Sequence, residues 1–440
     1  MDTLIANVTA VTVNEKMEVL FGAYLGITDG KISYLGTQPP QEEQPATIID
    51  GTGMVAMPGL VNCHTHLATT AMRSFVDDAA RAEALTEQLR REAKLDDRSV
   101  KAAALLGIAE CLRFGTTSVS DLYYYPDAVA QAAAEAGINA NVALASYRFI
   151  DHNEDFDFET DDQCVEAARV ADKWHGHEDG RIRIDAGLYA EYISNYKLWE
   201  GLVAWAEEKG LGLQLHLAES AREAEECLDR TGLGPGELLS SHGLFRVPAA
   251  ATGCVALEEL ERKLLGKKKV TAVSTPMAYA KAGLPATPIA DCAKAGMNVA
   301  LGTGGAVECG NLDMFEVMRF AAMDARRSGG DANSLPAAAV LMMATTCGAR
   351  AQGRADRTGM LKVGMDADII LVDFSAPHLI PCHDVMNALV FCAKGGDVAM
   401  TMVRGKILYQ NGTFPPIDQK TVVEEMMTYT IPRLMEAEKE

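Results

Sequence analysis

The stretch MPGLVNCHTHL, residues 57–67, joins a short apolar segment to two histidines. Leu60–Cys63 reads as a buried strand, and His64 and His66 follow at its carboxyl end. Side chains alternate along an extended segment, so His64 and His66 point the same way and both imidazoles can face one metal ion. In a closed parallel barrel, the functional site lies at the carboxyl ends of the strands. The stretch therefore predicts a barrel strand that ends in a metal site.

The chain that follows alternates apolar strands with amphipathic helices over roughly residues 58–355. Helical stretches such as Ser99–Phe114, Asp127–Ala136 and Tyr196–Lys209 separate the strands. With the first strand, the candidates number eight, which predicts an α/β fold built as a TIM-like (β/α)₈ barrel. The other seven candidate strands are Ser118–Asp121, Asn141–Ala145, Ile182–Leu188, Gly212–Leu217, Ala250–Val255, Val270–Val273 and Asn298–Leu301.

Both ends of the chain are rich in short strands. In residues 1–57, Asp29-Gly30 is typical of a hairpin turn, and Arg404-Gly405 marks a similar turn in residues 360–415. Neither end is large enough for a core of its own. We therefore expect the two ends to pair in one small composite β-sandwich domain, beside a barrel over residues 58–359. Residues 416–440 have apolar residues near helical spacing and predict a helical tail.

Composition narrows the classes of function. The formal net charge is −21, which disfavours binding to a nucleic-acid phosphate backbone. No run of 18 apolar residues predicts a membrane span. The ten cysteines form no Cys-x-x-Cys pair, and the first residues do not resemble a secretory leader. We expect a cytoplasmic protein that acts on a small-molecule substrate.

A second histidine motif lies on the fifth candidate strand, which ends in His216-Leu217-Ala218-Glu219. It places another imidazole and a carboxylate at the same rim as His64 and His66. Three histidines suit zinc, iron or a similar divalent ion. Spacing alone leaves a second interpretation open, in which buried histidines only satisfy backbone groups.

The residues around these motifs resemble the amidohydrolase superfamily over almost the whole chain. The segment Met57–Leu67 is similar to the family's first-strand signature, and the closest branch holds triazine chlorohydrolases and methylthioadenosine/S-adenosylhomocysteine deaminases. Further similar segments are Arg73 with Asp77-Asp78, Phe114–Thr117, His216–Glu219, Asn311–Phe315, Gly364–Asp368 and Pro377–Asp384.

The resemblance implies a site with one divalent metal. In the family, two first-strand histidines, a fifth-strand histidine and an aspartate after the eighth strand bind the metal. By resemblance, His64, His66 and His216 are metal ligands, and Glu219 is the catalytic residue that shuttles a proton to the leaving group. Zinc is the first choice, with iron or manganese as alternatives. The family also implies a homodimer.

The sequence departs from the family at several pocket positions. Gly304 stands where the family has the metal-binding aspartate, and Gly253 stands where it has a sixth-strand histidine. No histidine lies between His242 and His378, so a shift of register supplies none. The family's histidine after the fourth strand is Tyr189 here. Further replaced positions are Ala84, Ser274 and Tyr279.

These departures leave three interpretations. The first is a hydrolase that deaminates or hydrolyses a C–N bond of a nitrogen heterocycle, such as a purine nucleoside, pterin or triazine, with Tyr189, Tyr279 and Glu308 as candidate substrate-binding residues. Glu308 or Cys309 would then replace the missing aspartate. The second is a catalytically degenerate binding protein, and the third a non-hydrolytic, metal-assisted enzyme. Arg73 and Asp121 are candidate ion-pair partners at the rim, and neither is assigned a catalytic role.

Overall fold

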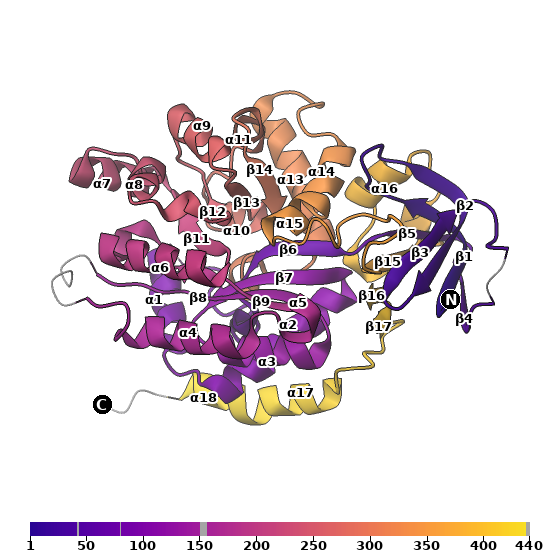
Figure 1. Ribbon diagram of the computed structural model, residues 1–440, viewed down its shortest axis with the longest axis horizontal. Helices are drawn as coiled ribbons and strands as arrows, with labels where there is room; N and C mark the ends of the chain where they lie inside the picture. Colours follow the sequence, from indigo (N-terminus) through magenta and orange to yellow (C-terminus); the bar gives the residue numbers. More distant parts are fainter. Residues whose placement is uncertain (42–43, 80, 150–155, 437–440) are drawn as a thin grey trace.

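The computed structural model describes residues 1–41, 44–79, 81–149 and 156–436. An α/β body holds most of the chain, and strands from both chain ends form a separate sheet at one end of it (Figure 1). Within the described residues, no helix combines the length and the apolar character that a membrane crossing requires.

Among the residues that the structure describes, the sheet at the end of the molecule has eight strands drawn from both chain ends. They are β1 (Thr3–Val11), β2 (Val19–Thr28), β3 (Lys31–Gly36), β4 (Thr47–Asp50), β5 (Met54–Pro58), β15 (Ile369–Asp373), β16 (Val398–Val403) and β17 (Lys406–Gln410). The order is β17-β16-β15-β5-β1-β2-β3, with β4 paired to β1. The antiparallel pair β5–β15 sets Pro58 opposite Ile369 and joins the two ends. The shared apolar face buries residues such as Ile5, Leu25 and Met400.

In the described part of the chain, nine parallel strands form the body in two sheets. They are β6 (Leu60–Thr65), β7 (Thr116–Tyr123), β8 (Asn139–Leu144), β9 (Ile182–Ile184), β10 (Ala186–Leu188), β11 (Leu213–Leu217), β12 (Ala249–Gly253), β13 (Thr271–Ser274) and β14 (Asn298–Leu301). The sheet orders are β6-β7-β8-β9 and β10-β11-β12-β13-β14. A parallel bridge between Ser146 and Leu188 joins β10 to the end of β8. After β14, the Gly304 N–H donates to the His64 carbonyl at 3.0 Å, so the sheets also adjoin at β6.

The fourth predicted strand, Ile182–Leu188, is interrupted at Asp185. This residue is 9% exposed, and its carboxylate accepts from the side chains of Asn141 and Gln214 at 2.9 and 3.0 Å. A buried carboxylate needs such donors, and they hold Asp185 where the ladder would otherwise continue. The other seven predicted strands lie in β6, β7, β8, β11, β12, β13 and β14.

Helices cover the outside of the parallel strands (Figure 1). The helix α6 has the bounds that the sequence predicts, Tyr196–Lys209, because Asn195 caps its first turn and Gly210 ends it at φ 70°. The others in the body are α1 (Arg81–Glu92), α2 (Asp97–Arg113), α3 (Pro126–Ala136), α4 (Asp162–Trp174), α5 (His177–Gly180), α7 (Ala221–Thr231), α8 (Pro235–Ser241), α9 (Glu259–Lys267), α10 (Pro276–Lys281), α11 (Ile289–Lys294), α12 (Ala306–Cys309), α13 (Met314–Gly329), α14 (Ala337–Met343), α15 (Thr346–Ala351) and α16 (Val385–Phe391).

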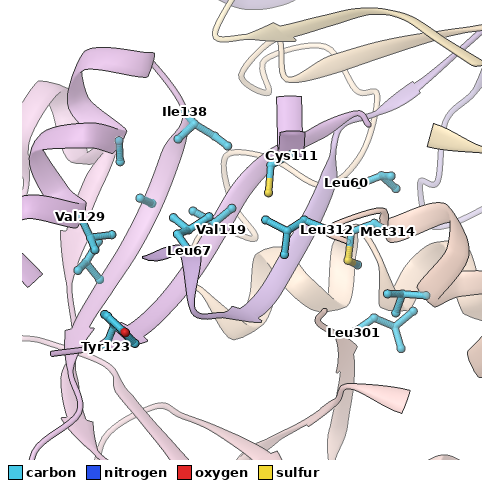
Figure 2. Packing of buried hydrophobic residues seen from close by; sticks show 14 of the residues in the cluster. Leu60, Leu67, Cys111, Val119, Tyr123, Val129, Ile138, Leu301, Leu312 and Met314 are labelled. Carbon is cyan, nitrogen blue, oxygen red and sulfur yellow. The ribbon is translucent and has the colours of Figure 1, made fainter. Parts of the chain in front are cut away.

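The main core fills the space between the parallel strands and these helices. Figure 2 shows part of it, with Val119 of β7 near Leu67 and with Leu312 and Met314 close to one another. Leu60 and Leu67, at either end of the histidine stretch, are fully buried. Dense packing on both sides fixes the backbone that carries His64 and His66.

The tail after residue 418 forms helices that pack against α2. The helix α17 (Gln419–Glu425) continues through a π-helical turn into α18 (Ile431–Met435). Met426 and Leu434 are buried, and the Tyr429 hydroxyl donates to Asp96, the N-cap of α2, at 2.8 Å. Arg98 forms an ion pair with Glu425. The tail therefore docks through both apolar and polar contacts.

Candidate active site

Three histidines converge at the carboxyl ends of β6 and β11. His64 is the second-last residue of β6, His66 lies just beyond the strand, and His216 lies in β11. One ring nitrogen from each lies within 4.8 Å of the other two. His64 Nε2 and His216 Nε2 are 3.2 Å apart. The structure thus brings together the three side chains that the sequence singles out as metal ligands.

The hydrogen bonds of these rings suit a metal site. His66 Nδ1 donates to the Leu122 carbonyl at 2.7 Å, and His216 Nδ1 donates to the Tyr189 carbonyl at 2.7 Å. A carbonyl oxygen only accepts, so in a neutral ring the Nε2 lone pair is left to face the other histidines. Burial also lowers the pKa of His64 well below its usual value and lowers the pKa of His66. The donor set fits a divalent ion such as zinc.

Glu219 lies beside the histidines in the loop that follows β11. The Tyr279 hydroxyl donates to Glu219 Oε1 at 2.8 Å. The loop itself is held by Glu223, whose carboxylate accepts from the backbone N–H groups of Ala218 and Glu219 at 2.9 and 2.7 Å. Burial raises the pKa of Glu223 to about 7. Glu219 is therefore positioned through both its backbone and its side chain.

An aromatic wall lines the cavity above the histidines. Tyr189 stacks on Tyr124 with ring planes 14° apart, and its ring centroid lies 5.3 Å from that of His216. Sequence reasoning singled out Tyr189 and missed Tyr124. The run Tyr123-Tyr124-Tyr125 at the end of the second candidate strand was a signal for it. A wall of stacked rings suits a planar, aromatic ligand.

The cavity is acidic. Four carboxylates line it, those of Asp77, Glu92, Glu219 and Glu308. Among the described lining residues, Lys281 is the one lysine or arginine, and it pairs with Asp77 at 2.5 Å. Burial raises the pKa of Glu92 to about 7. The cavity therefore favours neutral or cationic ligands over anions.

Comparison with known proteins identifies the family to which this chain belongs. Residues 55–408 match the model of the amidohydrolase family. The chain belongs to the amidohydrolase family. It is 34% identical over 425 residues to the 5-methylthioadenosine/S-adenosylhomocysteine deaminase of Acetivibrio thermocellus, covering 96% of this chain and 97% of the relative. It is 36% identical over 428 residues to the 5'-deoxyadenosine deaminase of Methanosarcina acetivorans, covering 97% of each chain.

Solved structures of amidohydrolase relatives share the fold. An adenosine deaminase from Xanthomonas campestris with bound zinc superimposes with a TM-score of 0.90 at 28% identity, over 98% of each chain. A zinc complex of an atrazine chlorohydrolase from Arthrobacter aurescens gives a TM-score of 0.88 at 24% identity, over 97% of this chain and 99% of the other. At 24% identity, the similarity to the atrazine chlorohydrolase shows a shared fold and nothing more.

The amidohydrolase resemblance implies a histidine at position 253. The chain has Gly253 there, and the Tyr279 hydroxyl occupies the space beside it. Gly253 has φ 103°, in the region that favours glycine. A Cβ atom there would lie 2.9 Å from the Tyr279 hydroxyl and 3.0 Å from Glu219 Cγ. The phenol thus stands beside the backbone from which the histidine side chain would extend, and it already bonds to Glu219.

The amidohydrolase resemblance implies an aspartate at position 304. The chain has Gly304 there, and the Glu308 carboxylate occupies the space beside it. Gly304 has φ 74°, and a Cβ atom there would lie 2.8 Å from Glu308 Oε2. That oxygen accepts from the Gly305 N–H at 2.9 Å, while Glu308 Oε1 lies 4.0 Å from His66 Nε2. A carboxylate therefore does stand beside the histidines, but it comes from α12.

Two other sequence expectations have different outcomes in the structure. Arg73 and Asp121 do not pair, because Arg73 binds Glu110 and Asp121 accepts from the Leu67 backbone N–H at 2.6 Å. Cys309 is buried, and its thiol contacts backbone carbonyls. Burial raises the pKa of Cys309 to about 12, so the thiol stays protonated and is a packed side chain.

Proposed function

We propose that this chain is a metal-dependent hydrolase that deaminates or hydrolyses a C–N bond of a nitrogen heterocycle. The observation that carries the proposal is the convergence of His64, His66 and His216 within 4.8 Å, with Glu219 beside them in one cavity. The named deaminase relatives support the same reaction class.

In this proposal, the three histidines hold one divalent ion, with zinc first and iron or manganese as alternatives. A bound ion of this kind lowers the pKa of water so that hydroxide is available near neutral pH. The Nδ1 bonds of His66 and His216 to backbone carbonyls keep both rings oriented toward the ion.

Glu219 moves the proton. Its carboxylate takes a proton from the attacking water and delivers it to the leaving nitrogen, which then departs as the amine or ammonia. The Tyr279 hydroxyl holds Oε1 at 2.8 Å and so fixes the carboxylate in one orientation. Tyr279 acts as a positioning residue through Glu219, whereas Glu219 itself contacts the reacting atoms.

The substrate class follows from the walls of the cavity. Tyr124 and Tyr189 offer stacked faces to a planar heterocycle such as a purine, pterin or triazine. Tyr189 is thus a substrate-binding residue in this proposal. The excess of carboxylates in the cavity selects against anionic substituents.

Ammonia release from a panel of compounds tests the proposal. The panel contains 5'-deoxyadenosine, methylthioadenosine, adenosine, a pterin and an aminotriazine, each incubated with zinc-loaded protein. Turnover of at least one compound that is lost in His216→Ala is the expected result. Absence of turnover in fully loaded protein would overturn the proposal.

A second candidate function is binding without turnover, which Gly253 and Gly304 favour. A tight complex with a panel compound that returns unchanged after long incubation would support it. A third is a non-hydrolytic, metal-assisted reaction, for which mass analysis would find an isomer or elimination product instead of a hydrolysis product.

We also propose that the two parallel sheets close into one barrel. The contacts at Ser146–Leu188 and Gly304–His64 support closure of the two parallel sheets into one (β/α)₈ barrel. The single sheet shared by both chain ends supports a composite β-domain of residues 1–57 and 360–415, and the sandwich form stays a prediction. The cytoplasmic location and the homodimer stay predictions, and light scattering tests the second.

A further inference from the structure

Glu308 has an oxygen directed toward the histidine cluster. It lies in α12, directly after β14, and its side chain is 34% exposed in the cavity. The Gly305 N–H fixes Oε2 at 2.9 Å. Oε1 then lies 4.0 Å from His66 Nε2, the nitrogen that faces the other two histidines. The carboxylate is therefore anchored by one oxygen and offers the other to the cluster.

The backbone at Gly304 makes this position possible. A Cβ atom at residue 304 would approach Glu308 Oε2 to 2.8 Å, closer than such atoms normally come. The left-handed φ of 74° also strains most side chains there. Glycine at 304 and glutamate at 308 thus form a matched pair, in which the absence of one side chain gives room to the other.

We propose that Glu308 is the fourth protein ligand of the metal that His64, His66 and His216 hold. This inference rests on the proposed function. Two atoms bound to one zinc at about 2.0–2.1 Å lie no more than about 4.2 Å apart. The separation of 4.0 Å between Glu308 Oε1 and His66 Nε2 is within this limit. Among the described residues, only the three histidines have ligand atoms that all lie within 4.8 Å of one another, so the Glu308 side chain must turn further toward the ion when it binds. A carboxylate also offsets charge that three neutral imidazoles leave uncompensated.

Zinc affinity, independent of turnover, tests the assignment. The whole protein is stripped of metal, and zinc is titrated in competition with a chromophoric chelator. Glu308→Gln keeps the shape and removes the charge, and we expect it to weaken zinc binding by about 10- to 100-fold. The visible spectrum of the Co²⁺-loaded protein should change in the same variant, because the ligand set changes.

Asp77→Asn is the matched control, since it removes a carboxylate from the same cavity. Loss of charge alone should alter zinc affinity by no more than about threefold at physiological salt, and leave the Co²⁺ spectrum as it is. Equal melting temperatures of the metal-free proteins check that each variant folds.

A rescue provides a second readout. Glu308→Ala should lose zinc affinity and open the space beside residue 304. Gly304→Asp in that background should restore affinity, because its carboxylate then enters the vacated space. Zinc binding and a Co²⁺ spectrum unchanged in both Glu308→Gln and Glu308→Ala would overturn the ligand assignment and leave the three-histidine site standing. Failure of the unaltered protein to bind zinc would instead overturn the proposed function.

Discussion

Glu219 is the residue that we propose to transfer the proton, and it is held by two other side chains. Tyr279 contacts it through the side chain and Glu223 through the backbone. These contacts come from two helices, α10 and α7. They fix the carboxylate next to the histidines without using a metal ligand, so proton transfer and metal binding can be tested separately.

Glu219→Gln preserves the shape of the side chain and removes its ability to take a proton. We expect kcat to fall by about 10²- to 10⁴-fold, the usual contribution of a general base. Zinc content should stay the same, since Glu219 is not a proposed ligand. Steady-state kinetics and metal analysis of one preparation give both numbers. A variant with native kcat would show that another group transfers the proton.

Tyr279→Phe removes the hydroxyl that orients Glu219. We expect a fall in kcat of about tenfold with little change in KM, the size of effect that loss of one hydrogen bond to a charged group produces. In the Glu219→Gln background, the same change should add almost nothing, because the two residues act as one unit. Losses that multiply in the double variant would argue for an independent role of Tyr279.

At this scale, the sequence predicted the histidines and Glu219 but missed several of their partners. His64, His66 and His216 follow from strand ends and spacing. The hydrogen bond between Tyr279 and Glu219 joins residues 60 positions apart. The packing of Tyr124 on Tyr189 brings together the residues that follow β7 and β10. Such contacts depend on the three-dimensional path of loops, which local patterns do not encode.

Among the elements, α1 (Arg81–Glu92) lies at the cavity and ends in a buried carboxylate. Glu92 is 7% exposed, and burial raises its pKa from the usual 4.5 to about 7. Between these two values, the folded protein holds a proton that the unfolded chain has released. The free energy of unfolding therefore falls as pH rises from about 4.5 to about 7.

Glu92→Gln should flatten this dependence. We expect the variant to gain stability relative to the unaltered protein as pH rises, by up to about 3 kcal/mol at pH 8. Urea unfolding at several pH values measures the difference. A difference in stability that does not change from pH 5 to pH 8 would contradict the raised pKa of Glu92.

Elements with strong periodicity were predicted well, and elements set by distant contacts were not. The strands β6, β7, β8 and β11–β14 and the helix α6 follow from hydrophobic runs and caps. The break at Asp185 depends on Asn141 and Gln214, which lie in other strands. The four-residue α12, which carries Glu308, is too short to show a helical period.

At the scale of the whole molecule, we expect negative charge to disfavour anionic substituents on the substrate. The net charge is −21, and carboxylates outnumber cations in the described lining of the cavity. We expect kcat/KM for 5'-deoxyadenosine to exceed that for adenosine 5'-monophosphate by about tenfold, because carboxylates outnumber cations in the lining but the bound ion and Lys281 offset part of their charge. Added salt should reduce the ratio of the two kcat/KM values, because it screens the charges. Equal kcat/KM values for both compounds would contradict the electrostatic account.

The pairing of the two chain ends illustrates what composition conveys at this scale. Strand-rich ends around an α/β middle predicted that they would meet, and β5 pairs with β15 across more than three hundred residues of sequence. The register, with Pro58 opposite Ile369, depends on the turns and packing of the assembled sheet. The identity of the substrate depends likewise on the assembled cavity.

The central claim is that His64, His66 and His216 hold one divalent ion. Elemental analysis of protein purified without chelators tests it most directly, with a His64→Ala/His216→Ala variant prepared in parallel. The account predicts about one equivalent of zinc, iron or manganese per chain in the unaltered protein and below about 0.1 equivalent in the variant. Unaltered protein that stays empty after incubation with zinc, or a variant that retains a full equivalent, would contradict it.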